Sequence, residues 1–128
     1  MTPEHENQLI IKYPELFAQH GWPTTATCMS WGIETGDGWF DILDNLCASL
    51  EQLKQKKPGI QELQFTQIKE KYGALTIYTN YWWKEVESLI NSVAEQSLAV
   101  CELCGLPGRI NNVSWSSARC EKHDDQTR

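Results

Sequence analysis

Three cysteines and a histidine near the C-terminus have the spacing of a metal site. Their pattern is Cys101-x2-Cys104-x15-Cys120-x2-His123. Each closely spaced pair can supply one edge of the tetrahedron that Zn²⁺ prefers, with thiolate and imidazole as ligands. Four protein ligands leave no open position for water or substrate, so we expect a structural zinc ion rather than a catalytic one.

Four acidic residues, Glu34, Asp37, Asp41 and Asp44, form a second candidate site. Their spacing places the carboxylates along one edge of a predicted helix. Three interpretations stay open: a solvated face with favourable charges at a helix N-terminus, a binding surface for a basic partner protein, and a divalent-metal site of a hydrolase. A nuclease site would also need a lysine or histidine close by, and the sequence places none there.

A third candidate is the aromatic cluster Tyr78, Tyr81, Trp82 and Trp83. Aromatic side chains of this kind belong to a core, form an adhesive surface patch, or stack on single-stranded bases. Because Trp82 and Trp83 are adjacent, one helix cannot point both inward. We place Trp82 on the apolar side of the helix and expect Trp83 to be exposed at a partner site.

Hydrophobic periodicity predicts three helices, over residues 4–12, 38–56 and 81–99. Asp37 is the expected N-cap of the second helix and Asn80 that of the third. The third helix leads directly into Cys101, so we expect the metal site to be attached to a core helix.

Alternating apolar residues predict a strand over 25–33 and a hairpin with arms at 61–69 and 74–79. Gly73, at the hairpin turn, is expected to take a positive φ or to form a bulge. The predicted fold is therefore α+β, with a small antiparallel sheet of about three strands packed with two main helices and a C-terminal zinc ribbon. We expect one domain, with a core over 1–100 and a zinc-binding appendix over 101–128.

The composition bounds the class of partner. The 128 residues carry a formal net charge of -6 and no basic stripe, which disfavours nucleic acid, because phosphate neutralisation supplies most of such affinity. No apolar run approaches the roughly 20 residues of a membrane span, and the N-terminus lacks the pattern of a signal peptide, so we expect a cytoplasmic location and no membrane partner. The cysteine count is odd, which favours metal binding over disulfides, and Cys28 and Cys47 are expected to be buried.

Several motifs together resemble a known family. They are Trp31-Gly-Ile-Glu34, Gly36-Asp-Gly-Trp-Phe-Asp41, Gln67-Ile-Lys-Glu-Lys-Tyr-Gly73, Ala94-Glu-Gln-Ser97, CELCGLPG from Cys101 and CEKH from Cys120. This set is similar to a family of small zinc-knuckle proteins found in bacteriophages, prophages and their bacterial hosts. The resemblance spans about residues 13–123 and implies a phage accessory protein, without implying an activity.

The leading functional hypothesis is a non-enzymatic, zinc-stabilised module that binds another protein, as a phage-encoded modulator or inhibitor of a host or defence factor. The acidic edge and Trp83 are the expected contact surface. One alternative is a nucleic-acid-binding zinc ribbon that uses Arg109, Arg119 and Lys122. A second alternative is a metal-dependent hydrolase that uses the acidic cluster. The identity of the partner and the oligomeric state stay open.

Overall fold

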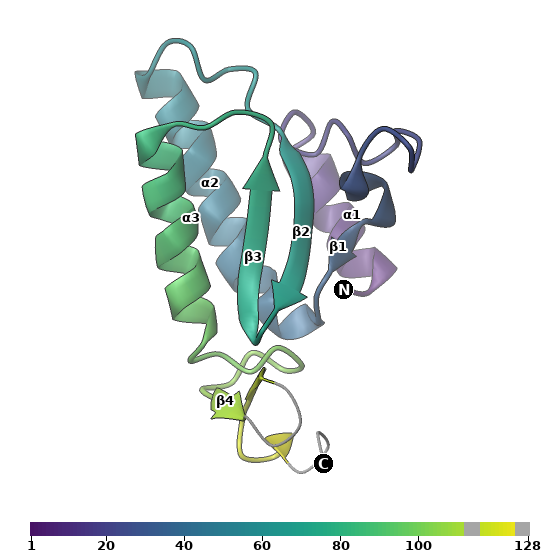
Figure 1. Ribbon diagram of the computed structural model, residues 1–128, viewed down its shortest axis with the longest axis vertical. Coiled ribbons are helices and arrows are strands. Elements are labelled where there is room, and N and C mark those ends of the chain that lie inside the picture. Colours follow the sequence, from purple (N-terminus) through teal and green to yellow (C-terminus); the bar gives the residue numbers. More distant parts are fainter. Residues whose placement is uncertain (112–115, 125–128) are drawn as a thin grey trace.

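The computed structural model describes residues 1–111 and 116–124, and they form an α+β fold with a small sheet (Figure 1). The α-helices are α1 (Pro3–Lys12), α2 (Phe40–Lys56) and α3 (Lys84–Ser97). The strands are β1 (Ile33–Glu34), β2 (Phe65–Lys71), β3 (Ala74–Thr79), β4 (Arg109–Asn111) and β5 (Ser117–Arg119), and two short 3₁₀ helices are η1 (Cys28–Trp31) and η2 (Asp37–Trp39). In this view α2 lies behind the sheet and α3 runs beside β3. Within the described residues, no helix has the length and apolar character needed to cross a membrane.

The three-stranded sheet is mixed, not antiparallel as predicted. Its order is β1-β2-β3, with β1 parallel to β2 and β2 antiparallel to β3. Ile68 lies opposite Ile33 on one side and Ile77 on the other. The connection from β1 to β2 contains α2, and such a helical crossover returns the chain to the same end of the sheet, which gives parallel pairing.

The strand predicted for 25–33 is wrong over most of its length, since residues 28–31 form η1. The Thr27 hydroxyl accepts a hydrogen bond from the Met29 amide at 3.1 Å, which caps the 3₁₀ turn. Gly32 then takes a φ of 78° before the two-residue strand β1 begins. The turn leaves Met29 buried but places Trp31 on the surface, 66% exposed, and Cys28 is exposed as well, against expectation.

The long helix α2 supplies much of the core, as its periodicity predicts. Ile42, Leu43, Leu46 and Leu50 are buried, together with Cys47, whose burial was expected. The helix begins at Phe40, after η2, and Asp37 does not cap it. The Asp37 carboxylate accepts a hydrogen bond from the Thr2 amide at 2.8 Å instead.

The β2–β3 hairpin closes through a two-residue turn. Tyr72 and Gly73 have φ values of 53° and 87°, which confirms the positive φ predicted for Gly73. Two successive residues with positive φ are typical of the type I′ turn, whose twist matches that of the flanking strands.

Helix α3 begins later than predicted, at Lys84, and this reverses the roles of two tryptophans. Asn80 does not cap the helix, because its side chain accepts from the Gln64 amide and donates to the Glu62 carbonyl, both at 2.8 Å. Trp82 therefore lies before the helix and is 70% exposed. Trp83 is half-buried and packs against the core, so the prediction that Trp83 is the exposed member of the pair is wrong.

Candidate metal centre

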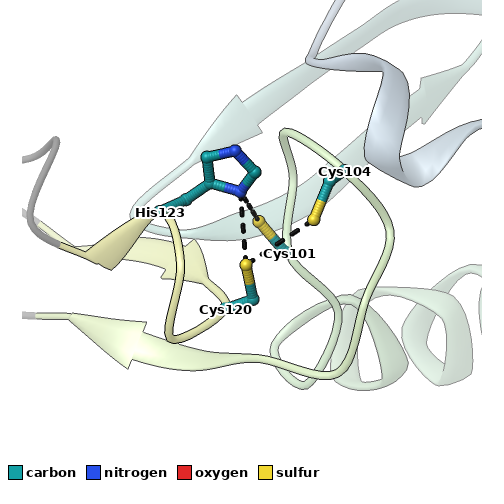
Figure 2. Close-up of side chains that lie close together, drawn as sticks. All are labelled: Cys101, Cys104, Cys120 and His123. Atoms are coloured by element: carbon teal, nitrogen blue, oxygen red, sulfur yellow. Dashed lines mark hydrogen bonds between the residues drawn. The ribbon is translucent and has the colours of Figure 1, made fainter.

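The four predicted ligands lie together, with all donor atoms within 4.8 Å of one another. His123 Nδ1 is 3.2 Å from Cys120 Sγ and 3.5 Å from Cys101 Sγ, and Cys104 Sγ is 3.6 Å from Cys120 Sγ (Figure 2). A tetrahedral site with Zn–S bonds of about 2.3 Å has ligand atoms about 3.8 Å apart. The cluster therefore matches the dimensions of a tetrahedral metal site and could hold a metal ion.

Local backbone geometry presents the first pair of ligands. The Gly105 amide donates to the Cys101 carbonyl at 2.9 Å, and the Cys101 amide donates to the Leu106 carbonyl at 2.8 Å. Gly105 has a φ of 82°, a conformation that glycine adopts without strain. The chain thus turns tightly around the two sulfur atoms, as the Cys-x2-Cys spacing predicts.

The second pair follows the β4–β5 hairpin. Cys120 comes directly after β5, and the His123 amide donates to the Cys120 carbonyl at 3.1 Å, which folds the histidine back over the cysteine. The imidazole faces the thiols with Nδ1 (Figure 2). We call residues 101–111 and 116–124, which carry all four ligands, the metal module.

Backbone amides prepare Cys101 for metal binding. Burial alone would raise the pKa of the Cys101 thiol, but the amides of Cys120, Cys104 and Leu103 outweigh it and lower this pKa to about 6. Thiolate, not thiol, is the metal-binding form of cysteine. The lowered pKa of Cys101 therefore favours the form that binds metal.

The metal module is held on the core through Glu102, the residue after the first ligand. Its backbone carbonyl accepts from the Gly38 amide at 2.7 Å, and its carboxylate accepts from the Gly36 amide at 3.0 Å. Its amide donates to the Ala118 carbonyl at 3.0 Å, and the same carboxylate lies 3.3 Å from the Arg119 guanidinium. Glu102 thus joins the start of η2, the Cys101–Cys104 turn and β5.

The close approach between η2 and the metal module requires glycine on the core side. A Cβ atom on Gly38 would lie 2.0 Å from the Cys101 carbonyl oxygen, and one on Gly36 would lie 2.4 Å from the Glu102 carbonyl oxygen. The Trp39 indole N–H donates to the Val100 carbonyl at 2.9 Å, next to the first ligand. The Gly-Asp-Gly-Trp motif is therefore the part of the core against which the metal module packs.

The β2–β3 turn forms a second contact with the metal module (Figure 1). A Cβ atom on Gly73 would lie 2.7 Å from the Ile110 side chain and 3.3 Å from the Ser117 amide nitrogen. Ala118 is fully buried in the main hydrophobic core. Two of the motifs named above, Gly-Asp-Gly-Trp and Lys-Glu-Lys-Tyr-Gly, hence touch the metal module.

The structure divides the four predicted acidic residues into two pairs. Asp37 accepts from Thr2 and lies 3.4 Å from the His5 imidazole, whereas Asp44 accepts from the Lys12 ammonium at 3.0 Å and the Tyr13 hydroxyl at 2.8 Å. Asp37 and Asp44 therefore fasten the N-terminal segment to η2 and α2. Glu34 and Asp41 are exposed. Over the described ranges, only the Cys/His cluster brings three or more potential metal ligands together, and these four carboxylates do not form such a group.

Asparagine at Asp44 should lower the free energy of unfolding by about 1.5–3 kcal/mol at pH 7, the value of a hydrogen bond to a charged group. Burial raises the pKa of Asp44, but the bonds from Lys12 and Tyr13 outweigh it, and the folded-state pKa lies below the ordinary value. The stabilisation is therefore present above the unfolded pKa of about 3.9 and is lost as the pH falls through the folded value. Urea denaturation between pH 7 and pH 2 measures the difference.

The control for this prediction is Asp41→Asn, which removes the same charge from an exposed position on the same helix. It should change the free energy of unfolding by less than about 0.5 kcal/mol at either pH. If Asp44→Asn lowers the free energy of unfolding equally at pH 7 and pH 2, the charged Asp44 does not stabilise the fold through Lys12 and Tyr13.

The basic residues of the nucleic-acid alternative are not equally available. Arg119 is only 14% exposed and is paired with Glu102. Arg109 is exposed, with its guanidinium 3.7 Å from an Asp124 carboxylate oxygen, and Lys122 is exposed. The neutralised Arg119 reduces the positive field that phosphate binding needs.

Comparisons of the chain with protein-family models, curated proteins and solved structures gave no match. The family resemblance of the motifs therefore stays a prediction. The sequence analysis did not identify Glu102, because a single glutamate between two cysteines matches no motif that would indicate its contacts. The paired glycines before Trp39 could have indicated a close backbone contact, since closely approaching chains require glycine.

Proposed function

We propose that the protein is a non-enzymatic protein-binding module in which a structural Zn²⁺ holds the metal module on the core. The observation that carries this proposal is the complete donor set of Cys101, Cys104, Cys120 and His123, in tetrahedral proximity. Three thiolates and one imidazole are a set that structural zinc sites use, and thiolate-rich sites select Zn²⁺ over hard cations. With four protein donors the ion would stabilise the fold without activating a water molecule.

The partner proposal rests on exposed charge and exposed aromatic side chains. Glu34 and Asp41 project from the acidic edge, and the net charge of -6 would attract a basic surface over a distance of about a Debye length. Trp82, not Trp83, is the exposed tryptophan that this proposal assigns to the contact surface. The resemblance to phage and prophage proteins adds the proposal of a modulator or inhibitor that acts on a host or defence protein in the bacterial cytoplasm.

Affinity capture from host cells, before and during phage infection, tests protein binding. The intact chain should enrich a specific protein, measured by quantitative mass spectrometry. The double variant Glu34→Gln/Asp41→Asn should recover about five- to tenfold less of it, equivalent to about 1–1.4 kcal/mol. Both residues are exposed, so this change should leave folding intact.

The charge-matched control is Glu15→Gln/Glu62→Gln, which removes two exposed acids outside the acidic edge and should retain the partner. Equal loss in both double variants would mean that net charge, not this surface, determines capture. If the intact chain enriches no protein, the protein-binding role is contradicted. Salt-dependent affinity for DNA or RNA, or metal-dependent turnover of nucleotides, would favour one of the two alternative functions.

A further inference from the structure

A groove of about 460 Å³ lies between β3 and α3. Strand β3 is at the end of the sheet order, and α3 runs beside it (Figure 1). The segment that joins the two elements closes one end of the groove and contains Tyr81, Trp82 and Trp83. The groove is therefore bounded by a strand edge, a helix and an aromatic loop.

Aromatic side chains dominate this groove. Tyr78, Tyr81 and Trp82 are all substantially exposed, and Trp83 also lines the groove. The Tyr81 and Trp83 rings meet edge to face, with centroids 5.6 Å apart. The faces of such rings carry negative charge density and attract cationic groups, most strongly for tryptophan.

Glu87 is the one formally charged residue among those that line the groove. Its carboxylate accepts a hydrogen bond from the Trp82 indole N–H, which ties the carboxylate to the aromatic wall. The other groove-lining polar side chains, such as Asn80 and Asn91, are neutral. A carboxylate beside aromatic rings complements an ammonium or guanidinium group in charge and in shape.

The β3 backbone adds a second recognition element. The Leu75 amide donates to the Ser97 hydroxyl in α3 at 2.9 Å, away from β2, whereas the Asn80 amide donates to the Gln64 carbonyl, at the β2 end. Because backbone direction alternates along a strand, the amides and carbonyls of Ile77 and Thr79 face away from β2, as Leu75 does. An extended segment can pair with a strand edge of this kind.

We propose that this groove binds an extended segment of a partner protein and receives a lysine or arginine side chain of that segment between the aromatic rings and Glu87. The proposal rests on the proposed protein-binding function and specifies the chemistry of the partner. The acidic net charge of the chain supports a basic occupant, because it favours approach of a positively charged segment.

The direct test is an NMR titration of the ¹⁵N-labelled, metal-loaded chain with a synthetic peptide. The probe is an acetylated and amidated pentapeptide, Val-Thr-Arg-Thr-Val, and its match carries citrulline, the neutral isostere, in place of arginine. The arginine peptide should shift the Trp82 indole signal and the Ile77 amide and bind at least tenfold more tightly than the citrulline peptide. Trp82→Ala and Glu87→Gln should each weaken binding at least fivefold.

Trp31→Ala is the control variant, since Trp31 is about as exposed as Trp82 but does not line the groove, and it should bind the arginine peptide normally. Equal affinity for the two peptides, undiminished binding to Trp82→Ala, or no binding of either peptide would overturn the proposal. Choline or arginine amide that binds as tightly as the peptide would also overturn it, in favour of a small organic cation.

Capture of the cellular partner separates this inference from the proposed function. A partner retained by Trp82→Ala and Glu87→Gln but lost by Glu34→Gln/Asp41→Asn would overturn the groove assignment and leave protein binding intact. A partner lost by the two groove variants supports the inference.

Discussion

Serine in place of Cys104 should release the metal and lower the melting temperature of the protein by more than about 15 °C. Structural zinc contributes on the order of 10–16 kcal/mol in small peptides, whereas a whole domain has a stability of only about 5–15 kcal/mol. Loss of even about 4 kcal/mol corresponds to about 15 °C, because about 1 kcal/mol shifts the melting temperature by about 4 °C at this chain length. Scanning calorimetry and elemental analysis of bound zinc measure the two effects.

Cys28→Ser is the matched control, since Cys28 and Cys104 are both exposed cysteines and only Cys104 belongs to the cluster. The control should keep one equivalent of zinc and its melting temperature. Chelation of the unmodified chain should reproduce the Cys104→Ser result. If the Cys104→Ser protein has the same melting temperature as the parent, the cluster does not stabilise the fold through a metal.

Alanine at Gly38 should destabilise the protein by about 3 kcal/mol and weaken zinc retention, although position 38 is not a ligand. The added Cβ would lie 2.0 Å from the Cys101 carbonyl oxygen and 2.6 Å from the Glu102 carbonyl carbon. Both are backbone atoms, which cannot move aside as a flexible side chain can, so the metal module must shift away from η2. Urea denaturation measures the stability, and competition with a chromogenic chelator measures zinc retention.

Gly21→Ala is the control for this effect, because a Cβ atom at Gly21 would meet nothing within 4 Å. It should be within about 0.5 kcal/mol of the parent and should retain zinc normally. If Gly38→Ala lowers stability but leaves zinc retention unchanged, the contact with η2 is a packing contact without influence on the metal site.

The parts of the molecule that depend on local pattern could be predicted from the sequence. The proximity of the four Cys/His side chains was predicted from two spacings, the buried side of α2 from its periodicity, and the positive φ of Gly73 from its place in a hairpin. Each Cys/His pair, the buried side of α2 and the hairpin turn depends on residues within one turn or one helix. The α+β class follows from the order of such elements.

The remaining parts depend on contacts between distant segments. Asp37 and Asp44 have the spacing of an exposed acidic edge, but Thr2, Lys12 and Tyr13 from the N-terminal segment engage them. The sequence predicts Trp83 to be exposed and Trp82 to be buried, whereas in the structure Trp82 is exposed and Trp83 is half-buried. Asn80 bonds to the segment before β2 instead of capping α3, and the helix begins after both tryptophans. Alternation at 25–33 predicted a strand, but the Thr27 cap gave η1. In each case a hydrogen bond that periodicity does not reveal decided the outcome.

The contact of the metal module with η2 couples the proposed zinc site to the whole fold. The Gly36 amide and the Glu102 carboxylate are 66 positions apart in the chain, and Trp39 and Val100 are 61 apart. The chain between these partners contains α2, the hairpin and α3, so the contacts carry the closure cost of a long loop and depend on the assembled fold. Zinc that binds only the folded state would stabilise that state. By thermodynamic linkage, a more stable core then gives a higher apparent affinity for zinc. If the cluster holds zinc as proposed, a substitution deep in the core, far from any sulfur atom, should therefore weaken zinc retention when zinc is scarce.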